Sequence, residues 1–199
     1  MKLHLTHLSS RFQFPTAYQV HQMVGVLAGD GTGRPLYFFN RDGLDAHLWI
    51  QTEGEIQATD FGPWKAERHV LDIQAKTGEC FGFHLRFNPS ICRRGVKRDL
   101  ATLIKHERDL TWDEARIEAV NAWMDKRVEH LGFRVDDVAV ERCNWSKIEK
   151  PDGNVIGYSE FDVAGRLRVT DPKRFETTLC TGVGDERAFG CGLIRLYRI

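Results

Sequence analysis

The sequence lacks most of the features that would place it in a familiar class. Its five cysteines include no Cys-x-x-Cys pair, so a zinc ribbon or a secreted disulfide framework is poorly supported. The eight histidines show no His-Glu-x-x-His spacing, and we expect no metal and no other cofactor. No stretch approaches the roughly 18 apolar residues that cross a bilayer, and charged residues interrupt the N-terminus, which has no signal-peptide core. We therefore expect a soluble, cytoplasmic protein with no membrane partner.

Net charge is absent as well, because 28 Lys and Arg balance 28 Asp and Glu. This balance excludes a uniformly basic surface for nucleic acid, but the charges are segregated along the chain. Residues 41–79 hold four basic and eight acidic residues, whereas the stretch from Arg86 to Arg98 holds five basic residues and no acid. The basic part can meet a polyanion. A solvated loop with nearby counter-charges is the alternative.

The 199 residues suffice for one large domain or two small ones. In the first half, alternation predicts a strand over 2–8, and Thr16 is a plausible N-cap for a helix that runs to about Leu27. Further strands are predicted over 36–39, 47–50 and 70–73, with at most a weak helix over 60–67, which Gly62 and Pro63 interrupt.

The second half repeats this order. Alternating segments predict strands over 80–87, 133–140, 155–170 and 189–197. An apolar stripe predicts a helix over 112–131, and a short helix is predicted after Asp171-Pro172. The pattern predicts an α+β fold of two tandem ferredoxin-like (RRM-like) domains, each β-α-β-β-α-β. We place the domains at residues 1–77 and 78–199.

The first candidate site is Tyr18-x-x-His21 on the opening helix. Both side chains share a stripe beside the core-facing one, so their polar ends can reach the same point without burial. A histidine can accept or donate a proton near neutral pH. An ordinary surface histidine beside a tyrosine is the alternative.

The second candidate is a glycine-rich loop, with Gly182, Gly184, Gly190 and Gly192. It is not a dinucleotide fingerprint, because it follows a helix and precedes the terminal strand. Glycines allow the backbone to approach closely either a partner backbone or a phosphate. A tight turn with close strand packing remains the alternative.

The third candidate is a pair of basic segments, Arg93–Arg98 and Arg142–Lys150. The second lies at the tip of a predicted hairpin that ends in the turn Pro151-Asp152-Gly153-Asn154. Long cationic side chains there can enter a groove of structured RNA, which is read through phosphates, 2′-hydroxyls and shape. A solvated hairpin is the alternative.

These segments together carry a family resemblance. The stretch from Val163 to Leu193, with GRLRVTDP and then GVGDERAFGCGL, resembles the C-terminal signature of the CasE endoribonucleases, which process precursor CRISPR RNA in type I-E systems. Phe83–Pro89 before a basic loop, and Trp123-Met124 through Gly132-Phe133 around the long helix, support the similarity. Tyr18-x-x-His21 falls where that family carries its catalytic tyrosine and histidine. The similarity covers nearly the whole chain.

The resemblance implies two ferredoxin-like domains and metal-independent cleavage at the 3′ base of a repeat hairpin. It implies that His21 transfers a proton with Tyr18 as its partner, and that the protein stays on the mature guide RNA with other Cascade subunits. The residues it suggests for holding the hairpin RNA are Arg93, Arg94, Lys97, Arg98, Arg142, Lys147, Lys150 and Arg187. Asp185-Glu186 make the glycine-rich loop more acidic than the resemblance leads one to expect.

The chemistry suits these residue types. The 2′-hydroxyl beside the scissile phosphate would attack in line and expel the 5′-oxygen, leaving a 5′-hydroxyl and a 2′,3′-cyclic phosphate. Whether His21 serves as general base or general acid stays open. A non-catalytic RNA-binding or scaffold subunit of the same kind of assembly is the competing hypothesis.

Overall fold

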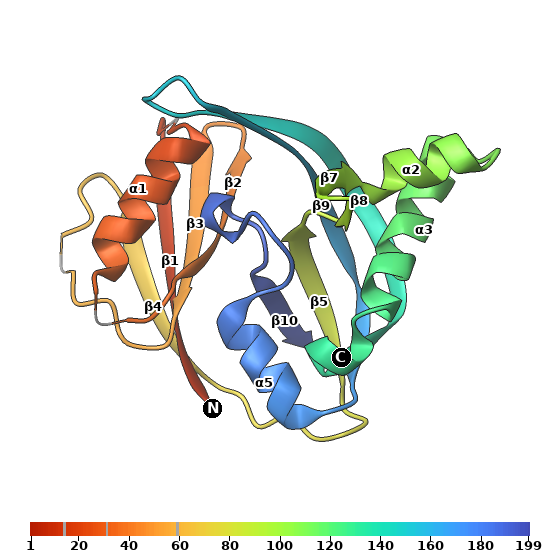
Figure 1. Ribbon diagram of the computed structural model, residues 1–199. Helices are drawn as coiled ribbons and strands as arrows, with labels where there is room; N and C mark the ends of the chain where they lie inside the picture. The colour runs from red at the N-terminus through yellow and green to blue at the C-terminus, as the bar shows by residue number, and fades with distance from the viewer. Residues whose placement is uncertain (14, 31, 59) are drawn as a thin grey trace.

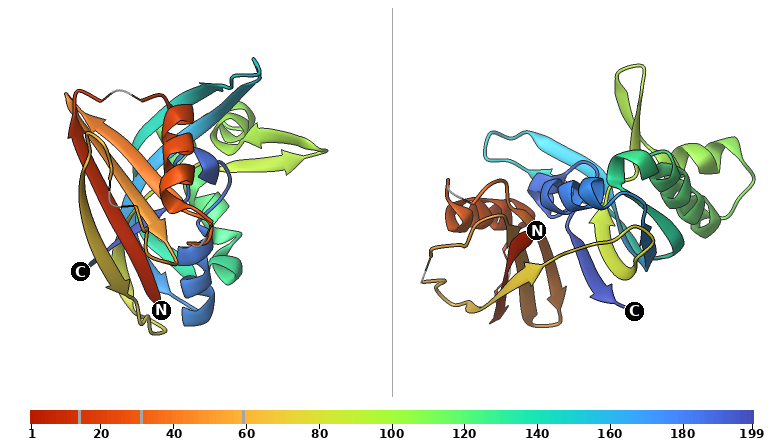
Figure 2. Two further views of the ribbon diagram at one scale, coloured as in Figure 1. Left: turned by 90° about the vertical axis from the view of Figure 1, so that its left-hand side faces the viewer. Right: turned by 90° about the horizontal axis from the view of Figure 1, so that it is seen from below.

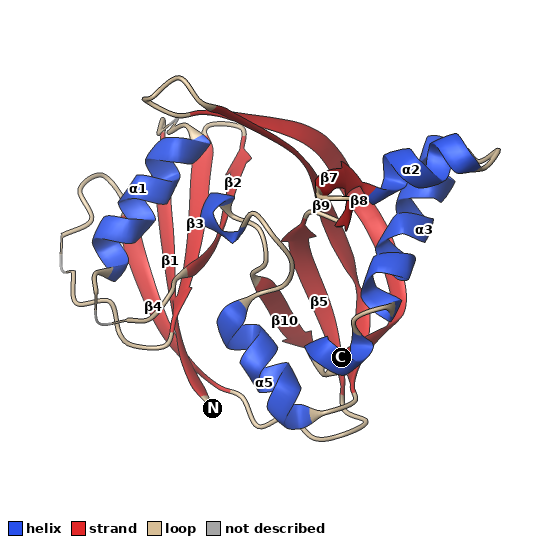
Figure 3. Ribbon diagram, viewed as in Figure 1, coloured by secondary structure: helices blue, strands red, loops and turns tan. Residues whose placement is uncertain are grey.

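The computed structural model describes residues 1–13, 15–30, 32–58 and 60–199. The described residues form two four-stranded antiparallel sheets and a separate two-stranded hairpin (Figure 1, Figure 3). The main helices of both halves lie on one side of the sheets, and the two-stranded hairpin projects on that same side (Figure 2). No helix in the described ranges is long and apolar enough to cross a membrane.

The first sheet belongs to the N-terminal part of the chain. Its elements are β1 (Lys2–Arg11), α1 (Ala17–Ala28), β2 (Leu36–Asp42), β3 (Asp45–Thr52) and β4 (Lys65–Asp72), and its strand order is β2-β3-β1-β4. Helix α1 begins as predicted, because the Thr16 side chain accepts from the Gln19 backbone N–H while the Gln19 side chain accepts from the Thr16 N–H. Such a cap is worth about 1 kcal/mol, and it starts the helix one residue before Tyr18.

The first unit differs from the prediction in one element. The weak helix expected over 60–67 is not formed, and the described residues between β3 and β4 are irregular. Gly62 has a φ of 58°, a left-handed conformation, and Pro63 follows it, so the chain turns here instead of coiling. Strand β4 then begins at Lys65, earlier than the predicted Val70.

The second sheet has the strand order β10-β5-β9-β8. Its elements are β5 (Cys80–Phe87), β6 (Ser90–Arg93), β7 (Val96–Asp99), α2 (Leu100–Glu107), α3 (Trp112–Asp125), α4 (Val128–Leu131), β8 (Phe133–Glu149), β9 (Val155–Val169), α5 (Pro172–Thr181), the 3₁₀ turn η1 (Arg187–Phe189) and β10 (Ile194–Arg198). In both sheets the first strand of the unit is central and lies between the third and the fourth. This arrangement confirms the predicted tandem ferredoxin-like fold. The boundary at residue 77 stays a prediction.

Several details of the second half also differ from expectation. The strand predicted over 189–197 begins only at Ile194, because a 3₁₀ turn and the glycines at 190 and 192 precede it, and helix α2 was not predicted. The helix predicted over 112–131 is broken at Lys126 and Arg127 into α3 and α4, and Ile117 of the predicted apolar stripe is 42% exposed. The basic loop after Asn88-Pro89 is the hairpin β6–β7, whose strands are too short to give a recognisable alternating pattern.

Hydrogen bonds between described residues join the two units. The Tyr37 hydroxyl donates to the Ala188 carbonyl at 2.6 Å, and Gln51 Nε2 donates to the Leu179 carbonyl at 2.6 Å. Arg86 Nη1 donates to the Phe39 carbonyl at 2.9 Å. Between them, Leu36 and Phe38 of β2 pack with Leu193 in a small buried cluster. The sheets therefore meet along a built seam.

Candidate functional site

Tyr18 and His21 lie on α1 where that helix faces the second unit. Both side chains are half-buried, and their ring centroids are 6.3 Å apart. The core side of the helix carries the buried residues Val20 and Val24 instead. The two rings therefore share the partly exposed stripe that the sequence predicted.

The second unit supplies the surroundings of these rings. The Phe189 ring of η1 lies 5.6 Å from the His21 ring, centroid to centroid. Tyr18 packs against a small cluster formed by Ile148, Tyr158 and Cys191. His21 thus sits at the seam, neither inside a core nor on an isolated surface, and a group bound there meets both units.

The glycine-rich loop forms the other wall of this seam. All four predicted glycines have positive φ, from 75° at Gly184 to 91° at Gly192. A Cβ on Gly192 would lie 2.9 Å from the Val183 carbonyl oxygen, and the Val183 N–H donates to the Gly192 carbonyl at 3.0 Å. The glycines therefore allow a closed loop whose two ends touch.

Arg187 stands inside this closed loop. Its Nη1 donates to the Thr181 carbonyl at 2.5 Å, and its side-chain carbons would contact a Cβ on Gly182 or Gly192. One guanidinium nitrogen thus fixes the C-terminus of α5. Two residues after Arg187 comes Phe189, whose ring contacts the His21 ring.

The predicted basic segment 93–98 forms the β6–β7 hairpin, but its four cations differ in their surroundings. Arg94 stands in the turn with a φ of 54°, followed by Gly95 with a φ of 77°. Arg93 pairs with Glu107 at 3.1 Å. Arg98 is exposed on the hairpin face that also carries Arg93. Within the described part of the chain, Arg94 and Arg98 form no ion pair.

Lys97 explains the acidic residues of the glycine-rich loop. Its Nζ lies 3.1 Å from the Asp185 carboxylate and 2.6 Å from that of Glu186. Burial alone would lower the pKa of Lys97, but the hydrogen bonds with Glu186 and Asp185 outweigh it and raise the pKa. The two carboxylates therefore bind the hairpin to the loop and are already neutralised in part.

The other basic segment, 142–150, belongs to two faces of the β8–β9 hairpin. Arg142 lies opposite Asp162 and pairs with it at 2.7 Å. Lys147 lies on the opposite face, opposite Gly157, next to Trp145, which is 69% exposed. Lys150 is half-buried at the turn. The structure thus separates Arg142 from Lys147, a consequence of the two-residue alternation along a strand.

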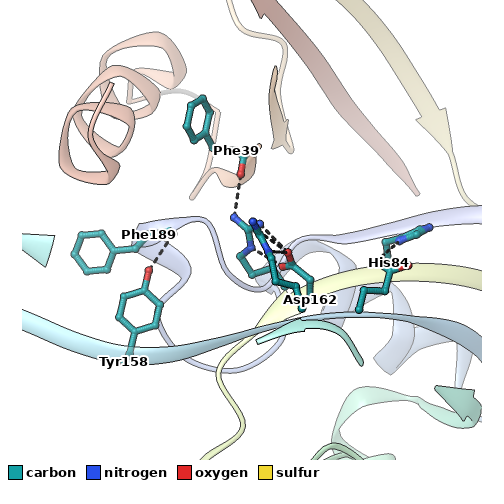
Figure 4. Close-up of polar contacts among 8 residues, drawn as sticks. Phe39, His84, Tyr158, Asp162 and Phe189 are labelled. Atoms are coloured by element: carbon teal, nitrogen blue, oxygen red, sulfur yellow. Dashed lines mark hydrogen bonds and ion pairs between the residues drawn. The ribbon is translucent and has the colours of Figure 1, made fainter. Parts of the chain in front are cut away.

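Asp162 is the centre of a buried charge cluster (Figure 4). Arg86 donates two hydrogen bonds to its carboxylate at 2.6 and 2.9 Å, and Arg142 donates a third at 2.9 Å. Burial would raise the pKa of Asp162, but the hydrogen bonds and charge of Arg86, followed by those of Arg142, hold it below its usual range. This cluster fixes Arg86 where it reaches the Phe39 carbonyl across the seam.

The sequence analysis missed two groups of residues. Trp145 is an exposed aromatic residue beside Lys147, and its position in a basic hairpin was the available signal. Arg127, His130 and Arg174 line a cavity next to the glycine-rich loop. They come from α4, its preceding residue and α5, so no spacing in the sequence relates them. In the ranges that the structure describes, no three His, Cys, Asp or Glu side chains gather as a metal site would require.

Fold and site define a tandem ferredoxin-like protein with a histidine and a glycine-rich loop at the seam between its units. A family model described as CRISPR associated protein matches residues 1–198. The chain therefore belongs to this CRISPR-associated protein family, as its resemblance to the CasE proteins predicted.

Relatives with known names agree with this assignment. The CRISPR-associated endoribonuclease Cse3 of Thermus thermophilus is 30% identical over 132 residues, which cover 60% of this chain and 56% of that protein, so the match spans little more than half of the relative. The structure of T. thermophilus Cse3 bound to an RNA representing a pre-cleavage complex has a TM-score of 0.76 at 22% identity, covering 99% of this chain and 100% of that one. Cas6e from Escherichia coli K-12 has a TM-score of 0.69 at 19% identity, and both chains are covered completely. These structures share the fold of this chain.

Proposed function

We propose that the protein is a metal-independent endoribonuclease that cleaves precursor CRISPR RNA at the 3′ base of the repeat hairpin. The observation that carries this proposal is the position of His21, which lies half-buried at the seam against Phe189 of the glycine-rich loop. The named relatives support it, because Cse3 is an endoribonuclease whose structure has been solved with RNA. After cleavage the protein would stay on the mature guide RNA, together with other Cascade subunits.

The reaction needs only groups that the RNA and this chain supply. The 2′-hydroxyl loses its proton and forms a bond to the adjacent phosphorus, while the bond from phosphorus to the 5′-oxygen breaks and that oxygen gains a proton. His21 serves one of these two proton transfers, with Tyr18 beside it. A positioned acid or base contributes about 10²–10⁴-fold, which is about 3–6 kcal/mol of the barrier. Cationic side chains near the seam would stabilise the charge that develops on the phosphate.

The basic residues that would hold the hairpin RNA come from two hairpins and the glycine-rich loop. The β6–β7 hairpin contributes Arg93, Arg94, Lys97 and Arg98, the β8–β9 hairpin contributes Lys147 and Lys150, and Arg187 lies in the loop. Of these, Arg94, Arg98 and Lys147 are exposed and unpaired among the described residues. Arg142 lies on the face of β8 that carries Ile148 and meets Tyr18, but Asp162 already binds its guanidinium, whereas Lys147 lies on the opposite face.

His21→Ala, assayed in EDTA on a repeat hairpin, tests the function. We expect cleavage to fall by at least 10²-fold, while the affinity for the hairpin stays within about twofold. His69→Ala removes an exposed histidine from β4 and serves as the matched control. An RNA with a 2′-deoxy sugar at the cut site should bind and stay intact.

Two outcomes would contradict the proposal. If the unaltered protein binds the hairpin but never cuts it, the non-catalytic scaffold hypothesis replaces it. If the 2′-deoxy RNA is cut efficiently, the attacking group is not the 2′-hydroxyl.

A further inference from the structure

A cavity of about 570 Å³ opens between α3–α4, α5 and the glycine-rich loop. Arg127, His130, Arg174 and Arg187 line it from separate elements, and Thr177 and Thr181 of α5 lie on the same wall. Asp185 is the single carboxylate among the described residues of the lining, and Lys97 pairs with it. The cavity therefore has an excess of positive charge.

The arginines of the cavity are positioned by the ends of helices. Arg127 donates to the Trp123 carbonyl at 3.0 Å and stacks on the Trp123 ring at 3.9 Å. Arg174 donates to the Glu129 carbonyl and pairs with Asp171 at 3.5 Å, and Arg187 donates to the Thr181 carbonyl. These contacts use one N–H group each of Arg127 and Arg187 and two of Arg174, out of the five that a guanidinium carries, so donors remain for a ligand. Within the described residues Arg127 forms no ion pair. Burial of its guanidinium lowers the pKa.

We propose that this cavity binds a backbone phosphate of the single-stranded RNA that leads away from the scissile position. The inference rests on the proposed function. Arginine forks match phosphate oxygens in bidentate geometry, and a cavity of this volume holds a nucleotide-sized group, whereas a duplex is too wide to enter. Arg187 connects the cavity to the seam, because it lines the cavity and stands two residues before Phe189, which contacts His21.

Arg127→Gln combined with Arg174→Gln tests the site by equilibrium binding, which does not depend on cleavage. Two RNAs are compared, the repeat hairpin with single-stranded flanks and the same hairpin cut back to its stem. We expect the affinity for the flanked RNA to fall by about tenfold per arginine, with a salt slope reduced by about 1 per phosphate contact. The affinity for the trimmed hairpin should stay within about twofold. Lys65→Gln, an exposed position on β4, is the matched control.

A second variant leaves the hydrogen bonds between the arginines and the helix-end carbonyls in place, so it tests the cavity without removing them. Thr177→Glu places a carboxylate on the cavity wall and should weaken binding of the flanked RNA alone, whereas Thr177→Gln, of equal length and uncharged, measures crowding. Equal losses on both RNAs, or no loss on either, would overturn the proposal. The third measurement is the thermal stabilisation of the unaltered protein and of the double variant by inorganic phosphate. If the double variant loses this stabilisation but keeps full affinity for the flanked RNA, the cavity binds a small phosphate and not the RNA backbone, which would overturn the proposal. Failure of the unaltered protein to cut any RNA would refute the proposed function and leave this binding comparison intact.

Discussion

Loss of Asp162 should destabilise the fold, because its carboxylate is shared by Arg86 and Arg142. Its carboxylate is 17% exposed and the Arg86 side chain is 8% exposed, and Arg142 and Arg195 lie in the same region. Asp162→Ala leaves Arg86 buried without its partner, and we expect the free energy of unfolding to fall by about 3–5 kcal/mol. Asp137→Ala breaks an exposed pair with Arg166 in the same sheet and should cost at most about 1 kcal/mol. Urea denaturation of both variants measures the difference, and equal losses would contradict it.

The same carboxylate should make stability depend on acid. The pKa of Asp162 is lowered in the folded protein, so its contribution is complete above the ordinary aspartate pKa of about 3.9. The contribution is lost as the pH falls from there towards the lowered pKa. Asp162→Ala should flatten this acid limb of the stability curve.

The relative positions of site residues could be predicted where the residues lie on one helix or strand. Tyr18 and His21 share a helix stripe, and the period of a helix places them together. Arg142 and Lys147 are close in sequence, but they are five residues apart in a continuous stretch of β8, so the alternation of the strand assigns them to opposite faces. The partners of Lys97 lie nearly ninety positions further along the chain, and no local pattern indicates such a contact.

At the scale of elements, substitutions in the turn of the β6–β7 hairpin can distinguish effects on stability from effects on RNA binding. Both turn residues, Arg94 and Gly95, have positive φ, as in a two-residue type I′ turn, for which Asn-Gly is a favoured sequence. Arg94→Asn should therefore keep or raise the unfolding temperature. It removes a cation, so the affinity for the repeat hairpin should fall, with a salt slope lower by about 1.

The control for this prediction changes the neighbouring turn position. Gly95→Ala keeps the charge but forces a Cβ into a left-handed conformation, so it should lower stability. Affinity measured at several salt concentrations distinguishes the two variants. Unchanged affinity in Arg94→Asn would exclude this turn from the RNA-binding surface.

Elements with strong caps or long alternation were predictable, and short or irregular ones were not. Thr16 and Thr111 mark the starts of α1 and α3 because each forms a capping box. The break at Lys126 and Arg127 contains no Gly or Pro from which it could be predicted. At this break the Arg127 guanidinium stacks on the Trp123 ring. Hairpin β6–β7 depends on tertiary support, since Trp123 Nε1 donates to the Ser90 carbonyl at 3.0 Å.

At the scale of the whole molecule, the candidate site exists only because the two units are joined. His21 comes from the first sheet's helix, whereas Phe189 and the glycine-rich loop come from the second unit. The tandem of ferredoxin-like domains could be predicted because the order of strands and helices is repeated in the two halves. The seam instead depends on individual hydrogen bonds, such as those of Arg86 and Gln51. These bonds connect positions at least 47 residues apart, a separation at which sequence periodicity gives no information.

Tyr37 offers a way to loosen this seam without touching either ring of the site. Its buried hydroxyl donates to the Ala188 carbonyl, next to Phe189, and burial raises its pKa, so it stays a donor at neutral pH. Tyr37→Phe removes that bond alone and should cost about 0.5–1.5 kcal/mol of stability. Because the loop then holds Phe189 less firmly against His21, we expect the single-turnover cleavage rate to fall more than the affinity for the hairpin. Tyr197→Phe, at an exposed ring on β10 that lies 5.6 Å from the tilted His84 ring, should change neither, and an equal loss of rate in both variants would show that the seam does not position the site.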